Sequence, residues 1–407
     1  MGPKTLLLFF CLLVCAPAVA QPTSIQILDE HTLDMDGVQK NRLDTVKKLP
    51  GAVEYKLFVP LEGALLTKQF RLNTAELFGN GGANYILNIQ RSDSKANFAK
   101  NADVFGKIGL DLSTFNKSAE ANFTVREGQI TGTVVDQGFA YVVRPLGGGL
   151  HAIVKRDLSK LPPDHPAEQP PPASPRGPVD DFNSKNDLGS AKSTVPIVVG
   201  YSSAVETTTA DPLGLVQNAV EITNQSFENS KIPLKVELRG VVRLELPAQL
   251  DVLKGAALLV AKDQSMSLLL DLKSQAKAAF AIVLVSEGWA CGKASVILGK
   301  PDDAYAAVRQ DCAVDKRSFP HELGHLFGAR HERLSDPNPL PFPFGHGYQS
   351  KSHAWRDIMA NDCGEKCDRR LIWSSPDMII DSEPAGTVEY EDNARLIRQT
   401  GPFIANW

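Results

Sequence analysis

The sequence has few cysteines, no marked excess of charge of either sign and almost no long apolar runs. Among its 407 residues are 6 cysteines, 43 Lys and Arg residues and 47 Asp and Glu residues, which gives a formal net charge of −4. Such a balance excludes the basic surplus that binds nucleic acid or an anionic membrane surface. At this length we expect two domains, each large enough to bury a core.

The one long apolar run lies at the start of the chain. Leu6 to Val19 is almost wholly apolar, follows a lysine and ends at Ala18-Val19-Ala20. The run is too short to cross a bilayer, and its small residues are typical of a signal-peptide cleavage site, so that residues 1–20 would be a signal peptide. We therefore expect a secreted or periplasmic protein. A buried core helix and a lipid anchor at Cys15 are the alternatives.

Residues 21–160 form the first predicted domain. Its first thirty residues are polar and show no clear period, whereas short β-rich runs recur from Val53 onwards. Turn signals such as Gly147-Gly148-Gly149 separate these runs. The pattern predicts a small antiparallel all-β domain, and it contains no catalytic motif.

Residues 161–193 are rich in proline and polar residues, and we expect an exposed, extended linker. Within it, Asp164 and His165 have the composition of a solvated linker pair, although both side chains could also donate to a metal. Exposed linkers are where proteases cut, and Arg176-Gly177 is the most plausible processing site.

Residues 194–407 form the second predicted domain, of the α+β or mixed α/β class. Ile197–Tyr201 and Phe280–Val285 have the composition of buried strands, and Asp211-Pro212 is typical of a helix start. Alternating strands and helices predict a twisted mixed sheet with helices packed on it. Cys291–Leu298 would supply its edge strand.

The pattern H-E-x-x-H-x-x-G-x-x-H begins at His321. His321 and His325 lie four residues apart and therefore share one face of a helix, so that both imidazoles can reach one cation. The Glu322 side chain projects from the helix close enough to the metal position to hold a water molecule there. Gly328 can adopt a left-handed conformation that ends the helix, and the turn returns His331 as a third nitrogen ligand. Three protein ligands are typical of a catalytic rather than a structural zinc site.

This pattern resembles the signature of the metzincin zinc peptidases. Their Met-turn has a counterpart in Arg-Asp-Ile-Met-Ala, in which Met359 follows His331 by 28 residues. Residues 373–377 and 393–400 are similar to segments of the reprolysin-like (adamalysin-like) members, and the resemblance covers residues 194–407. Two features differ from related subfamilies. Glu332 follows the third histidine, as in astacins, but Asn361 stands where astacins carry a zinc-binding tyrosine.

The resemblance implies a metzincin-type catalytic domain with one catalytic Zn²⁺ and an N-terminal propeptide-like domain. Glu322 would be the general base, Met359 would form an apolar floor under the metal, and an extended peptide would add to the sheet edge. The implied protein is a monomeric exported endopeptidase that acts on proteins or peptides and is made as a latent precursor. A zinc-binding adhesion or inhibitory module without turnover is the alternative, but the intact Glu322 favours an enzyme. The sequence does not indicate whether Ca²⁺ is required.

Latency through a cysteine thiolate, which many metzincin propeptides use, is excluded because the first cysteine after residue 20 is Cys291. Asp164 and His165 are the oxygen and nitrogen donors that could replace it. His346 and His353 could also reach a metal, but the three-histidine set is complete without them, and we expect ordinary loop residues.

Four cysteines remain after the signal peptide, all in the last third of the chain. An even number in an exported protein predicts two disulfides. Of the three possible pairings we favour Cys291–Cys312 and Cys363–Cys367. The first would lie before the predicted helix that carries His321 and His325, called the zinc helix below, and the second would close a tight loop after the Met-turn. A four-cysteine structural zinc site is the alternative.

Overall fold

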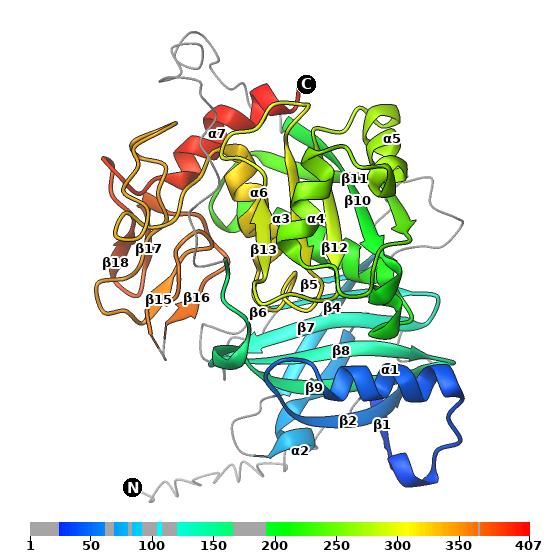
Figure 1. Ribbon diagram of the computed structural model, residues 1–407. Helices are drawn as coiled ribbons and strands as arrows, with labels where there is room; N and C mark the ends of the chain where they lie inside the picture. Colours follow the sequence, from blue (N-terminus) through cyan, green and yellow to red (C-terminus); the bar gives the residue numbers. More distant parts are fainter. Residues whose placement is uncertain are drawn as a thin grey trace, which may run out of the picture.

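The computed structural model describes residues 24–61, 69–79, 84–91, 104–107, 120–165, 193–364 and 367–407. The expected signal peptide and the expected processing site at Arg176-Gly177 lie outside the described residues. Two sheets dominate the described part, a long one near the N-terminus and a shorter one that helices cover (Figure 1). Among the described helices, none combines the length and apolarity that a membrane crossing requires.

The first sheet has nine strands in the order β1-β2-β9-β8-β7-β6-β5-β4-β3, and every neighbouring pair is antiparallel. Tight turns join β6 to β7, β7 to β8 and β8 to β9, and each contains glycine at positive φ. The strands are Ile25–Leu28, Ala52–Pro60, Gln69–Asn73, Asn84–Arg91, Val104–Lys107, Glu120–Arg126, Gln129–Asp136, Phe139–Gly147 and Leu150–Asp157.

Two helices correct the expectation that this part is all-β. Helix α1, Gly37–Lys47, begins at a capping box in which Asp36 and Gln39 satisfy each other's backbone N–H groups. Only Leu43 and Val46 are buried along it, so its apolar face was too narrow to give a helical period in the sequence. Helix α2, Thr74–Phe78, is a helix of only 5 residues between β3 and β4.

The second sheet has five strands in the order β11-β10-β12-β14-β13, parallel except for β13 at the edge. Alternate side chains of β10 enter two different cores. Ile197 and Val199 pack with helices α3, α6 and α7, whereas Val198 packs with α4 and α5. The strands β10 to β14 are Ser193–Ser202, Leu234–Leu244, Phe280–Val285, Gly292–Ala294 and Tyr305–Arg309.

Five helices cover this sheet, and two short strand pairs, β15 with β16 and β17 with β18, follow it in the chain. The sequence did not predict helix α4 or strand β14. Gly255 in the middle of α4 weakens the local helix signal, yet its missing side chain lets the helix approach Ala307 closely. The helices α3 to α7 are Pro212–Asn229, Val252–Val260, Ser267–Gln275, Ser318–Phe327 and Asn393–Ile404, and the remaining strands β15 to β18 are Trp355–Arg356, Asp368–Arg369, Ser375–Ile380 and Glu383–Ala385.

The two sheets are joined by buried polar contacts. Arg156 of β9 is fully buried and pairs with Asp315, just before the zinc helix. Thr133 of β7 donates to the same carboxylate over 2.7 Å. Arg126 and Asp211 form a second link over 3.2 Å, at the start of α3. These contacts hold the first sheet against the segment that leads into the candidate metal centre.

Candidate metal centre and active site

Helix α6 carries H-E-x-x-H, the first half of the pattern that begins at His321, and all ten of its residues are buried. Its N-cap is Arg317 in a left-handed conformation with φ 58°, and no side chain caps the helix start. The helix ends at Gly328 with φ 112°. The N–H of Ala329 then donates to the carbonyl of Gly324 over 2.9 Å, which closes the turn that brings His331 back.

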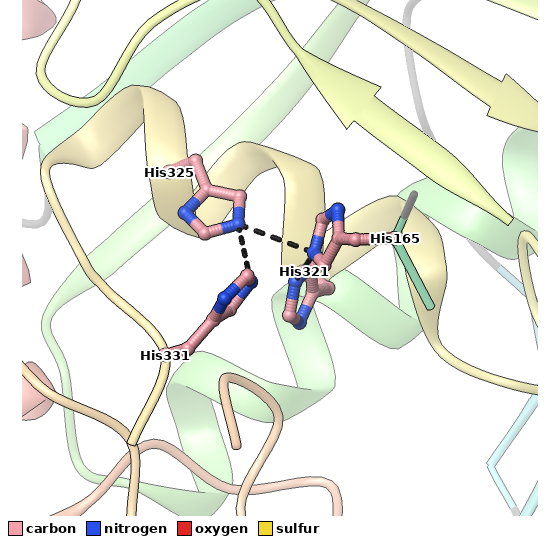
Figure 2. Close-up of side chains that lie close together, drawn as sticks. All are labelled: His165, His321, His325 and His331. Atoms are coloured by element: carbon pink, nitrogen blue, oxygen red, sulfur yellow. Dashed lines mark hydrogen bonds between the residues drawn. The ribbon is translucent and has the colours of Figure 1, made fainter. Parts of the chain in front are cut away.

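The three histidines of the pattern meet at one point (Figure 2). Nδ1 of His321 donates to the carbonyl of Ile358 over 2.7 Å. Nδ1 of His325 donates to the carbonyl of Ala329 over 2.9 Å. Because each Nδ1 holds the proton, each Nε2 presents a lone pair to the centre. Burial lowers the pKa of all three imidazoles well below the usual range, which keeps them neutral.

A fourth imidazole, that of His165, completes the cluster. The candidate ligand atoms of all four histidines lie within 4.8 Å of one another, and the Nε2 of His165 approaches those of both His321 and His325. The Nε2 atom of His325 lies 3.1 Å from that of His331 and 3.3 Å from that of His165. Four nitrogens around a tetrahedral zinc ion would be about 3.3 Å apart. The donor set therefore fits zinc, and the cation would remove the repulsion between facing lone pairs.

The position of His165 corrects the expectation of a solvated linker pair. Leu161 and Asp164 are buried, and only 10% of the His165 side chain is exposed. The N–H groups of Cys291 and Gly292 donate to the carbonyls of Pro163 and Asp164 over 2.9 and 3.1 Å. The composition of the whole linker suggested exposure, but its first five residues lie along the edge strand β13 because the cleft supplies partners for their polar groups.

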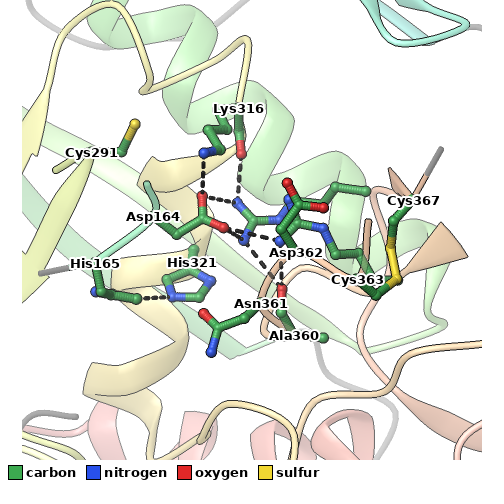
Figure 3. A network of polar contacts seen from close by, with 12 residues as sticks. Asp164, His165, Cys291, Lys316, His321, Ala360, Asn361, Asp362, Cys363 and Cys367 are labelled. Carbon is green, nitrogen blue, oxygen red and sulfur yellow. Dashed lines mark hydrogen bonds and ion pairs between the residues drawn. A yellow bond between two sulfur atoms is a disulfide. The ribbon is translucent and has the colours of Figure 1, made fainter. Parts of the chain in front are cut away.

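The Asp164 carboxylate lies in a buried cage of three cations (Figure 3). Arg369 binds both carboxylate oxygens, over 3.1 and 2.7 Å. Nη1 of Arg356 donates to Oδ2 over 2.9 Å, and Nζ of Lys316 lies 3.4 Å from Oδ1. Burial opposes ionisation of Asp164, but the three cations outweigh it and hold the pKa of its carboxyl well below the usual range.

Glu322 faces the same cleft from α6. A side chain at Gly292 would collide with its Oε1. Its Oε1 lies 3.8 Å from Nδ1 of His165. Burial raises the pKa of Glu322 well above its usual range, although the charge of Lys293 opposes this. A buried carboxylate is costly, and such groups occur at functional sites.

Met359 is fully buried and packs against α6 at Gly324. Its sulfur packs where a side chain on Gly324 would be, so that only glycine fits at that helix position. Asp357 holds the turn, because one of its oxygens accepts from the N–H groups of Met359 and Ala360 over 3.0 and 2.8 Å. The same turn supplies the Ile358 carbonyl that orients His321.

Several neighbouring residues orient the site without facing its centre. His346 is buried and its Nδ1 donates to the carbonyl of His331 over 3.0 Å, so its role is structural. Glu332 accepts the N–H of Asn361 over 2.7 Å and ties the third histidine to the Met-turn. His353 lies in a surface loop. None of these contacts could be found from the local sequence, because each joins separate segments.

The structure contains the two disulfides Cys291–Cys312 and Cys363–Cys367, with Cα–Cα distances of 5.5 and 5.4 Å. The first links the start of β13 to the loop before α6, and therefore joins the sheet edge to the zinc helix. The second closes a loop a few residues after Met359.

Comparisons with known proteins agree with this geometry. A family model described as metallo-peptidase family M12B, reprolysin-like, matches residues 215–332. A protein of Stenotrophomonas maltophilia named peptidyl-Asp metalloendopeptidase is 33% identical over 297 residues, which are 69% of this chain and 69% of the relative. A protein of Xanthomonas campestris pv. campestris with the same name is 32% identical over 295 residues, 69% of this chain and 68% of the relative. A third relative with this name, from Pseudomonas fragi, is 38% identical over 96 residues, 23% of this chain and 61% of its own length. The chain therefore belongs to the reprolysin-like metallopeptidases and is a zinc metalloendopeptidase.

Proposed function

We propose that this protein is an exported endopeptidase in which Glu322 is the general base, and that it is made as a latent precursor. The observation that carries the proposal is the joint position of Glu322 and the three pattern histidines. They come from one helix and the turn after it, and they face one buried cleft. His321, His325 and His331 would hold one zinc ion.

Zinc in this site would polarise the scissile carbonyl and stabilise the negative charge that develops on its oxygen. Glu322 would orient the attacking water and accept its proton. Glu322 would then return this proton to the leaving amine. Met359 and Asp357 would keep the histidines in place from below.

We further propose that the protein cuts at aspartyl residues. The support is the shared name of the relatives, peptidyl-Asp metalloendopeptidase, together with identities of 33% and 32% over 69% of this chain. This specificity requires a cationic site close to the metal.

Latency is supported by the contacts of residues 161–165. This short segment runs beside the edge strand β13, where an extended substrate would add, and His165 stands at the position left open by the other three histidines. The nine-stranded sheet, anchored through Arg156 and Asp315, would hold the segment there until the linker is cut. We expect the cut near Arg176-Gly177, and the signal peptide over residues 1–20 would direct export.

The experiment compares the uncut chain, residues 21–407, with a preparation from which residues 21–175 have been removed by cleavage in the linker. Both are incubated with a protein substrate, with and without a zinc chelator, and products are identified by mass spectrometry. The proposal expects chelator-sensitive cuts at aspartyl residues from the cleaved form, little activity from the uncut form, and inhibition when residues 21–175 are added back. Equal activity of both forms, unaffected by the added fragment, would show that the N-terminal part is a permanent accessory domain.

A further inference from the structure

Three buried cations converge on one carboxylate directly beside the metal centre. Arg369, Arg356 and Lys316 come from different segments, and each forms its ion pair with Asp164. The side chains of Arg369 and Arg356 are each 4% exposed, and that of Lys316 is 10% exposed. Cations this deeply buried are stable only when paired, so the cage needs an anion at its centre.

The two arginines of the cage are also held by contacts that do not involve Asp164. Arg369 also donates to the carbonyl of Lys316 over 2.7 Å, and Arg356 donates to the carbonyl of Ala360 over 2.7 Å. These bonds tie the guanidinium groups to the segments before the zinc helix and after Met359. The two guanidinium groups would therefore keep their positions when residues 161–165 leave, and the three charges of the cage would then lack the Asp164 carboxylate.

The backbone around Asp164 shows how a peptide reaches the cage. The carbonyls of Pro163 and Asp164 accept from consecutive N–H groups of the edge strand. From this backbone the Asp164 side chain enters the cage, while the next side chain, that of His165, enters the histidine cluster (Figure 3). Two consecutive residues, Asp164 and His165, therefore occupy the cationic cage and the metal centre. A substrate peptide on the same edge would place the side chain next to its scissile bond in this cage.

We propose that Lys316, Arg356 and Arg369 form the pocket that selects an acidic substrate side chain next to the scissile bond, and that Asp164 fills it as a substrate mimic in the precursor. The inference rests on the proposed endopeptidase function and names the residues of its specificity. Two guanidinium nitrogens of Arg369 match the two oxygens of a carboxylate, which neither an amide nor a hydrocarbon side chain can reproduce. A lysine or arginine side chain would be repelled by three like charges.

The test uses the whole chain with the substitutions Asp164→Ala and His165→Ala, which release the segment and leave the cage intact. Its substrates are peptides that differ only at one position, which is Asp, Asn, Ala or Lys. We expect kcat/KM for the Asp peptide to exceed that for the Asn peptide by at least about 100-fold, because Asn leaves buried charges unpaired. Adding Arg369→Met should reduce this ratio to less than about 5. Arg243→Met, which removes an exposed charge far from the cleft, should leave the ratio unchanged.

A binding measurement separates recognition from turnover. The hexapeptide Leu-Pro-Pro-Asp-His-Pro is titrated calorimetrically into the released chain that also carries Glu322→Gln, and its affinity is compared with that of the Asn version. The inference expects an affinity at least about 30-fold higher for the Asp peptide, lost on Arg369→Met or, where that variant fails to fold, on Lys316→Met. Equal binding of both peptides would overturn it.

The outcomes distinguish this inference from the proposed function. Chelator-sensitive proteolysis without an Asp preference, or an Asp preference that survives both Arg369→Met and Lys316→Met, would refute the pocket and leave the endopeptidase intact. Selective binding of the Asp peptide without any proteolysis by the released, zinc-loaded chain would retain the pocket and refute the proposed activity.

Discussion

Neutralising Asp164 in the uncut precursor should activate it. The substitution Asp164→Asn changes few atoms but leaves three buried cations without their anion. Breaking a buried ion pair from one side costs about 3–5 kcal/mol, which shifts the equilibrium between a closed and an open cleft by about 10²- to 10³-fold or more. His165→Ala should act in the same direction, because it removes the side chain that enters the histidine cluster.

The assay follows hydrolysis of a quenched fluorescent peptide by the uncut precursor, with gels that confirm an intact linker. We expect Asp164→Asn to raise the rate at least about 100-fold over the wild-type precursor, if the closed form predominates as the contacts of residues 161–165 indicate. Asp381→Asn is the matched control, since the Asp381 side chain is 63% exposed and pairs with Arg370 and not with a cation of the cage. If both Asp164→Asn and His165→Ala stayed as inactive as wild type, Asp164 and His165 would not be what closes the cleft.

Three further outcomes follow from contacts elsewhere in the molecule. Non-reducing peptide mapping should find Cys291–Cys312 and Cys363–Cys367, and free thiols or a Cys312–Cys363 link would contradict the structure. Asp315→Asn removes the ion pair with Arg156 and should lower the free energy of unfolding of the precursor by about 3 kcal/mol, measured by denaturant unfolding. A loss below about 0.5 kcal/mol, the size of an ordinary surface substitution, would argue against this link between the sheets. Burial lowers the pKa of His151 from 6.5 to about 4, so the unfolded chain binds a proton first as the pH falls. The contribution of neutral His151 to the free energy of unfolding is therefore fully present above pH 6.5, and about 3 kcal/mol of it is lost between pH 6.5 and pH 4. His151→Gln should remove this part of the acid sensitivity, and an unchanged slope of the melting temperature against pH would refute the assignment.

The metal centre could be predicted from the sequence because its donors are close together in the chain. His321, His325 and His331 lie on one helix and its following turn, so 3.6 residues per turn and one glycine are enough to bring them together. The long strands of the second sheet were equally clear, since side chains on both faces of β10 and β12 are apolar.

The contribution of residues 161–165 could not be predicted in the same way. His165 meets His321 across 156 residues of sequence, and Asp164 meets Arg369 across 205. Nothing in the local composition distinguishes this segment from the rest of a proline-rich linker. Helix α1 was missed for a different, local reason. Only Leu43 and Val46 are buried along it, and these two residues form too small an apolar face to give a helical period in the sequence.

The central claim is that Glu322 moves the proton in a zinc-dependent hydrolysis, and one measurement tests it most directly. Wild type and Glu322→Gln are activated by cleavage in the linker, their zinc content is determined, and their kcat/KM is measured on the same Asp-containing peptide. We predict that both retain about one zinc per chain, because three histidines hold the metal, and that the variant loses at least about three orders of magnitude in kcat/KM. Near-wild-type hydrolysis by the zinc-loaded variant would contradict the account.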